Sequence, residues 1–121
     1  MSPHPHPPQY EVEVVTNGSA SIVRVSGEFD MSAAQDVRDQ LSSVLPGDAV
    51  ALVLDLRETT FIDSSGLGVI VQLCNQSRED GIDFSVLPAD GPVRELLDLT
   101  GLTNALPIIE AMPSGNGSEA T

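Results

Sequence analysis

The sequence predicts a single domain of the α/β class, with a mixed β-sheet and helices packed mainly on one face. Near its start, two segments of strand composition flank Asn17-Gly18, a strong signal for an antiparallel hairpin. After them, helical patterns alternate with short apolar runs, as expected where crossover helices join parallel strands. The 121 residues suit one domain, and with 40% hydrophobic but only 3% aromatic residues the core must consist of aliphatic side chains.

The first half of the chain contains the hairpin and one helix. We expect antiparallel strands at residues 10–16 and 20–27. From Met31 the apolar residues follow steps of three and four, which predicts a helix capped near Ser32 and ended by Pro46-Gly47. The residues expected on its buried face are Ala34, Val37, Leu41, Val44 and Leu45.

The middle of the chain contains the strand expected at the centre of the sheet. Residues 50–56 are almost continuously apolar, which is typical of a strand buried on both faces. We interpret residues 57–63 as a connection to a second helix that ends before Asp80-Gly81. The residues expected to share a buried face of that helix are Leu67, Ile70, Val71 and Cys74.

The last part of the core adds a strand, a helix and a final strand. A short strand is expected at residues 83–87. Pro92 lies at the first position of the third helix, where its missing N–H does no harm, and Gly101 is placed for a left-handed ending. With a last strand at residues 105–108, the predicted order is β-β-α-β-α-β-α-β.

Charge and composition limit the kinds of partner. The chain has 18 acidic residues against 5 basic ones and a formal charge of −13, which argues against nucleic acid and anionic membranes. Excess negative charge keeps a protein soluble and monomeric, and its sharper interpretation is a basic partner. A single cysteine and a start without a basic or apolar leader segment predict a cytoplasmic protein. Residues 1–9 and 110–121 have the composition of disordered tails around a domain at 10–109.

The segment TTFIDSSGLGVI, residues 59–70, is the candidate functional site. It leads from a strand into a helix, where α/β proteins place binding groups beside free backbone N–H groups. Helix capping alone could explain an Asp or a Ser here, but three such residues stand where one suffices. Gly66 and Gly68 follow, each costing about 1 kcal/mol of helix propensity relative to Ala. This cost suggests that another molecule approaches closely.

Three stretches resemble the STAS domain, and within that group the anti-anti-sigma factors of bacteria. They are SGEFD at residues 26–30, FIDSSGLGVI at 61–70 and PVRELLDLTGL at 92–102, and they occur in family order. The resemblance implies an antagonist of an anti-sigma factor that is also a serine/threonine kinase. The unphosphorylated form binds this kinase and so releases a sigma factor, phosphorylation abolishes binding, and a serine phosphatase restores it.

The resemblance also implies which residues act. The phosphate maps onto Ser64, the first Ser of the D-S-S-G run, while Ser65 remains a rival acceptor. No catalytic residue, metal or cofactor is expected, and the free protein is expected to be a monomer. The residues expected to contact the partner are Asp30, Asp63, Ser64, Ser65, Gly66 and Leu67.

The sequence also suggests two other functions. An enzyme with Ser64 as nucleophile lacks a G-x-S-x-G turn, and both histidines, His4 and His6, lie in the expected N-terminal tail, so no base is placed to activate the hydroxyl. A STAS interaction module of a larger signalling or transport assembly, without phosphorylation, is the alternative that remains. The intact D-S-S-G run favours the phosphorylated switch.

Overall fold

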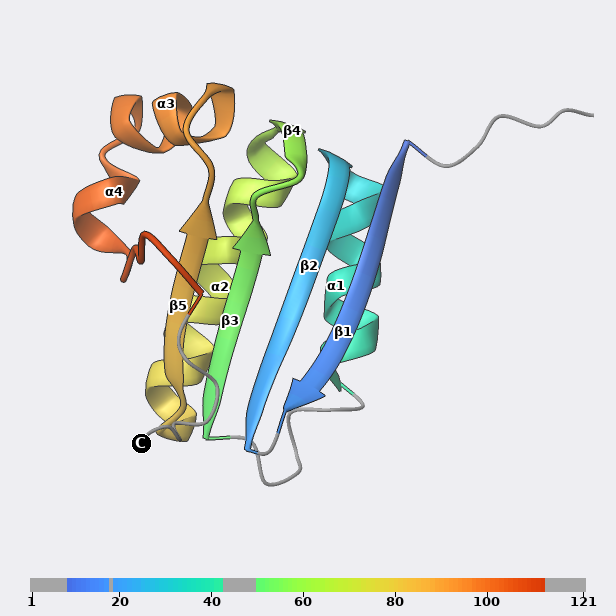
Figure 1. The fold of residues 1–121 in the computed structure, drawn as a ribbon, viewed down its shortest axis with the longest axis vertical. Coiled ribbons are helices and arrows are strands. Elements are labelled where there is room, and N and C mark those ends of the chain that lie inside the picture. The colour runs from blue at the N-terminus through green and yellow to red at the C-terminus, as the bar shows by residue number, and fades with distance from the viewer. Residues whose placement is uncertain (1–8, 18, 43–49, 113–121) are drawn as a thin grey trace, which may run out of the picture.

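Two long helices cover one face of a mixed β-sheet in a computed structural model that describes residues 9–17, 19–42 and 50–112 (Figure 1). The strands lie in the order β1-β2-β3-β5, and β4 pairs with β2 beyond the end of β3. The elements are β1 Tyr10–Asn17, β2 Ala20–Phe29, α1 Met31–Ser42, β3 Ala51–Leu56, β4 Thr59–Ile62, α2 Ser64–Asp80, β5 Asp83–Pro88, α3 Pro92–Leu99 and α4 Leu102–Ala105.

The strand pairing confirms the predicted class. β1 and β2 are antiparallel, with Tyr10 opposite Gly27 and Asn17 opposite Ala20, so the predicted hairpin is present. β2 and β3, and β3 and β5, are parallel. The sheet is therefore mixed, with an antiparallel edge strand on an otherwise parallel sheet.

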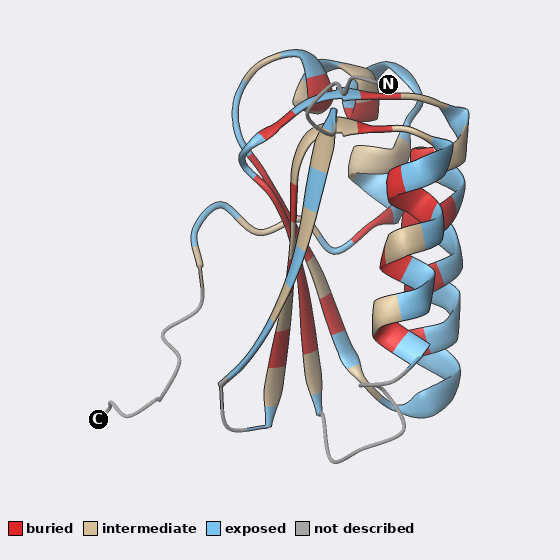
Figure 2. Cartoon of the chain, turned by 90° about the vertical axis from the view of Figure 1, so that its right-hand side faces the viewer, coloured by how far each residue is buried: buried red, intermediate tan, exposed pale blue. Residues whose placement is uncertain are grey.

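The aliphatic core lies between the sheet and the pair α1 and α2, which Figure 2 shows side by side on one face. Cys74 is buried as predicted. Along α2 the predicted face is partly right, because Ile70 and Cys74 are buried while Leu67 is half-buried and Val71 is exposed. The helix also runs through Asp80 and ends at Gly81, whose φ of 72° is left-handed.

The interpretation of residues 57–63 as a plain connection is wrong. Residues Thr59–Ile62 form β4, which pairs in parallel with the end of β2. The buried hydroxyl of Thr59 donates to the carbonyl of Val25 at 2.6 Å, and the register shifts between Gly27 and Glu28. A four-residue strand whose partner is about thirty residues away carries almost no local signal.

The predicted last strand at residues 105–108 is also wrong. After the left-handed Gly101, which does end the third helix region as predicted, the chain forms the short helix α4. Ile108 then makes a single parallel bridge to Val86, and the pairing does not continue into a strand. The chain after α4 crosses the face of the sheet opposite α1 and α2, as Figures 1 and 2 show together.

The start of α1 differs from the prediction as well. Asp30, not Ser32, caps this helix, because its Oδ1 accepts from the N–H of Ala33 at 3.1 Å. The helix is described through Ser42, so the predicted ending at Pro46-Gly47, with Val44 and Leu45, lies outside the described residues. None of the helices in the described part of the chain is long and apolar enough to cross a membrane.

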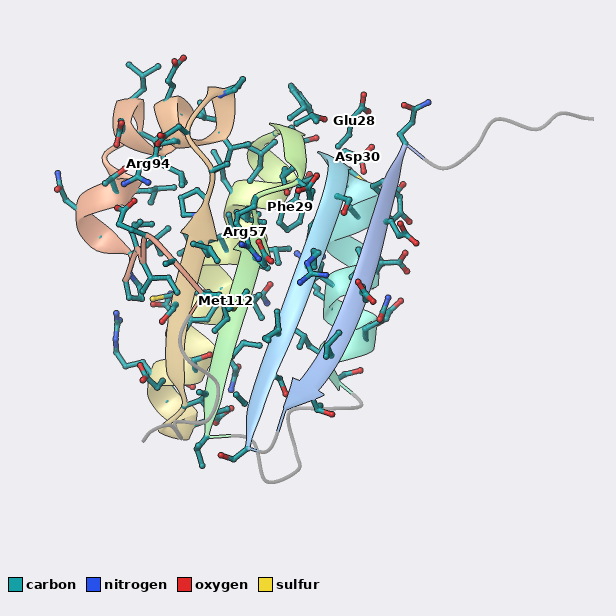
Figure 3. All side chains as sticks on the ribbon, in the orientation of Figure 1. Glu28, Phe29, Asp30, Arg57, Arg94 and Met112 are labelled. Atoms are coloured by element: carbon teal, nitrogen blue, oxygen red, sulfur yellow. The ribbon has the colours of Figure 1, made fainter. Side chains whose placement is uncertain are left out.

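On the face of the sheet that α1 and α2 do not cover, one buried carboxylate accepts hydrogen bonds from two arginines. Asp55 is fully buried and accepts from Arg57 Nε at 3.0 Å and Nη2 at 2.9 Å, and from Arg24 Nε at 3.1 Å. Burial alone would raise the pKa of Asp55, but the hydrogen bonds from Arg57 and Arg24 outweigh it and hold this pKa below its usual value. Figure 3 shows Arg57 near the end of β3. This network fixes the turn that leads into β4.

Candidate functional site

The D-S-S-G junction begins α2, and Asp63 is its cap. The backbone of Asp63 is extended, with φ −108° and ψ −172°. Its Oδ1 accepts from the N–H of Ser65 at 2.9 Å and of Gly66 at 3.1 Å. One carboxylate oxygen therefore satisfies two of the free N–H groups of the first turn.

Because Asp63 does the capping, the two serine hydroxyls are not needed for it. Ser64 is the first helical residue and is exposed, whereas Ser65 is half-buried. Within the described parts of the chain, neither hydroxyl has a hydrogen-bond partner. The junction thus presents an accessible hydroxyl at Ser64 that none of the described residues engages, on a backbone that Asp63 holds in place.

The two glycines of the motif have different reasons to be small. A Cβ at Gly66 would lie 2.5 Å from the carbonyl oxygen of Phe29 and 2.7 Å from Cγ1 of Ile62. A Cβ at Gly68 would meet nothing within 4 Å. At Gly66, the close approach that the sequence suggested is therefore the packing of α2 against the ends of β2 and β4. Of the two glycines, only Gly68 faces open space on the surface.

The pairing of β4 with β2 brings Asp30 to the same edge of the sheet as the D-S-S-G junction. This edge is the one at which β2 and β4 end and α1 and α2 begin. Phe29 lies opposite Ile62, and the N–H of Asp63 donates to the carbonyl of Phe29 at 3.4 Å. The next residue on each strand is the aspartate that caps the following helix. Figure 3 shows Asp30 and Glu28 at this end of β2.

This edge of the sheet also carries exposed apolar side chains that the sequence reasoning missed. Met31, the first residue of α1, is 71% exposed, and Phe61, on β4, is 52% exposed. Leu67, predicted to contact a partner, is half-buried and packs against the core. The signal for Met31 and Phe61 was their position beside Asp30 and Asp63, but their exposure depends on the fold.

The edge is acidic. Glu28, Asp30 and Asp63 lie on it, whereas nearby Arg57 is engaged by the buried Asp55. Among the described residues there is no group of three or more His, Cys, Asp or Glu that could hold a metal ion. The two histidines lie outside the described residues.

Comparison with known proteins agrees with this geometry. The family model described as the STAS domain matches residues 11–113. An anti-sigma F factor antagonist of Paenibacillus polymyxa is 34% identical over 101 residues, which cover 83% of this chain and 86% of the relative. An anti-sigma-B factor antagonist of Listeria monocytogenes is 28% identical over 96 residues, covering 79% and 84%.

A solved structure shows the same architecture. The crystal structure of an anti-sigma factor antagonist from Mycobacterium paratuberculosis superimposes with a TM-score of 0.73 at 26% identity, covering 90% of this chain and 92% of the other. The strand order of this chain and these similarities support the same fold. The chain belongs to the STAS domain family.

Proposed function

We propose that the chain is an anti-sigma factor antagonist controlled by phosphorylation of Ser64. The unphosphorylated form binds an anti-sigma factor that is a serine/threonine kinase, in the cytoplasm, and a serine phosphatase reverses the modification. The names of the relatives support the antagonist role. The observation that carries the switch is the exposed, unengaged Ser64 hydroxyl beside a cap that Asp63 already supplies.

A phosphate at this position is compatible with the fold. Ser64 makes no side-chain hydrogen bond with the described residues, so its modification breaks none of theirs. The N-terminus of a helix favours negative charge, by about 0.3–1 kcal/mol for an exposed group. We therefore expect phosphorylation to change the stability of the domain by no more than about 1 kcal/mol.

The same phosphate is unfavourable in an interface. It adds about −1.5 to −2 charges next to Asp63 and on the same edge as Asp30. A partner that covers this edge must remove water from all of these anions, which costs several kcal/mol for each charge that is not paired. Binding is lost because the partner would have to cover and desolvate this added charge where a neutral hydroxyl stood, without a change of fold.

Exposure distinguishes Ser64 from Ser65 as the acceptor. The Ser65 side chain is half-buried, and its backbone N–H is held by Asp63 at 2.9 Å. A kinase must enclose the acceptor hydroxyl, which favours the exposed Ser64. Phosphopeptide mapping after treatment with the kinase tests this choice, and phosphate confined to Ser65 would overturn it.

The switch itself is tested by measuring the affinity of Ser64→Ala and Ser64→Asp for anti-sigma factor kinases from the same genome. Ser64→Ala should bind like the parent and resist phosphorylation, while Ser64→Asp should bind at least about tenfold more weakly. Ser19→Asp is the matched control, because Ser19 is exposed at the opposite edge of the sheet. If both Ser64 variants bind like the parent, the phosphorylation switch is refuted, as expected for an interaction module without phosphorylation.

A further inference from the structure

We infer that Met31 and Phe61, the exposed apolar side chains on either side of the D-S-S-G junction, are the main anchors for the anti-sigma factor. The inference rests on the proposed function and adds the chemistry of the partner. The partner surface should offer apolar pockets for these two side chains, surrounded by Arg or Lys groups.

The register of β2 and β4 places Met31 beside Ser64. Phe29 and Ile62 are paired, each is followed by a capping aspartate, and each aspartate is followed by the first residue of a helix. Met31 and Ser64 thus hold corresponding positions on α1 and α2. These helices pack side by side, and Arg38 Nε of one donates to Gln72 Oε1 of the other at 3.1 Å.

Phe61 lies on the other side of the junction. It is opposite Glu28 in the β2–β4 pair, and its neighbour Ile62 enters the core. Successive residues of a strand point to opposite faces, so Phe61 points away from that core, and half of its surface is exposed. Phe61 is therefore an apolar projection that a partner can contact.

The position of these side chains separates them from ordinary exposed hydrophobic residues. Scattered apolar side chains are normal on a protein surface. Val50 is one, 57% exposed just before β3 and therefore at the opposite end of the sheet. Met31 and Phe61 instead flank the one exposed hydroxyl of the junction. Large flexible or aromatic side chains surrounded by polar groups are typical of the centre of a protein interface.

The charge of this edge identifies the partner's chemistry. Glu28 lies opposite Phe61, Asp30 precedes Met31 and Asp63 begins the junction, and the whole chain has a formal charge of −13. A basic surface complements these carboxylates, speeds association and makes it sensitive to salt. A phosphate on Ser64 would lie between the two anchors, so the partner could not bury both without covering the phosphate.

The inference is tested by measuring the affinity of Met31→Ala, Phe61→Ala and Val50→Ala for the same anti-sigma factor kinase that is used with the Ser64 variants. Met31→Ala and Phe61→Ala should each weaken binding by at least about tenfold, and Val50→Ala by less than about twofold. Met31→Gln and Phe61→Gln, which keep a bulky side chain, should weaken binding similarly. Thermal unfolding of each variant checks that the fold is kept.

The outcomes separate this inference from the proposed function. If Ser64→Asp abolishes binding while all the Met31 and Phe61 variants bind like the parent, the inference is overturned and the switch stands. If weakening by Met31→Ala and Phe61→Ala is matched by Val50→Ala, the inference also fails, since the effect is then not specific to this edge. If Met31→Ala and Phe61→Ala weaken binding but Ser64→Asp binds like the parent, the docking surface is supported and the phosphorylation switch is refuted.

Discussion

Replacing Gly66 by Ala should destabilise the domain, although Ala favours a helix. The helix propensity gained is about 1 kcal/mol. Against it, the new Cβ would lie 2.5 Å from the carbonyl oxygen of Phe29, 2.7 Å from Ile62 Cγ1 and 3.1 Å from Phe29 Cδ1. Overpacking costs about 1–3 kcal/mol and occasionally more, and the backbone oxygen of a paired strand residue cannot move aside. Because the shortest clash is with a backbone oxygen, we place the cost near the top of this range, at about 3 kcal/mol, and the expected net loss is then about 2 kcal/mol.

Gly68→Ala is the matched control on the same helix. Gly68 is exposed, and its new Cβ would meet nothing within 4 Å, so this variant should gain about 0.5–1 kcal/mol. Thermal unfolding followed by circular dichroism should show a Tm about 10 °C lower for Gly66→Ala and a few degrees higher for Gly68→Ala. A Gly66→Ala protein as stable as the parent, with weakened binding, would refute the packing argument and restore a partner contact as the reason for this glycine.

Two further predictions concern carboxylates. Asp63→Ala should lose about 1–2 kcal/mol in urea unfolding, because it removes the acceptor of two backbone N–H groups, while Asp63→Asn should keep most of that stability. Equal losses in both variants would contradict the capping role. Because the folded pKa of Asp55 lies below the unfolded value of about 3.9, its contribution is complete above that pH and is lost as the pH falls through the folded pKa. Asp55→Asn should therefore flatten the acid side of the stability profile below about pH 4, and parallel profiles would disprove the assignment.

Local chemistry made much of the candidate site predictable. Asp63 is a preferred cap before a helical pattern, and the junction of strand and helix is a common binding position in α/β proteins. The structure adds that Asp63 caps the helix, so that the Ser64 hydroxyl is exposed and not needed for capping. It also assigns Gly66 to the packing of α2, a role that depends on where Phe29 and Ile62 lie and that no local pattern reveals.

Local patterns in the sequence predicted the α/β class, the hairpin, the buried strand β3 and the cores of the three longer helices. Each of these follows from residues near one another in the chain: a turn dipeptide, an apolar run, a period of three and four, a glycine after a helix. These signals survive in any fold that uses the segments, which is why they could be recognised without coordinates.

Long-range pairing set three features: β4, the loss of the expected last strand, and the register that brings Asp30 to the edge of the sheet that holds Asp63. A strand is stabilised by hydrogen bonds to a neighbouring strand. Because β4 is only four residues long, its pairing with β2 outweighs the weak preference of its residues for the extended conformation. Residues after α4 have the composition of a strand but reach β5 for a single bridge. The register that sets Phe29 opposite Ile62 is a long-range choice, and it places Met31, Asp30 and Ser64 on one edge of the sheet.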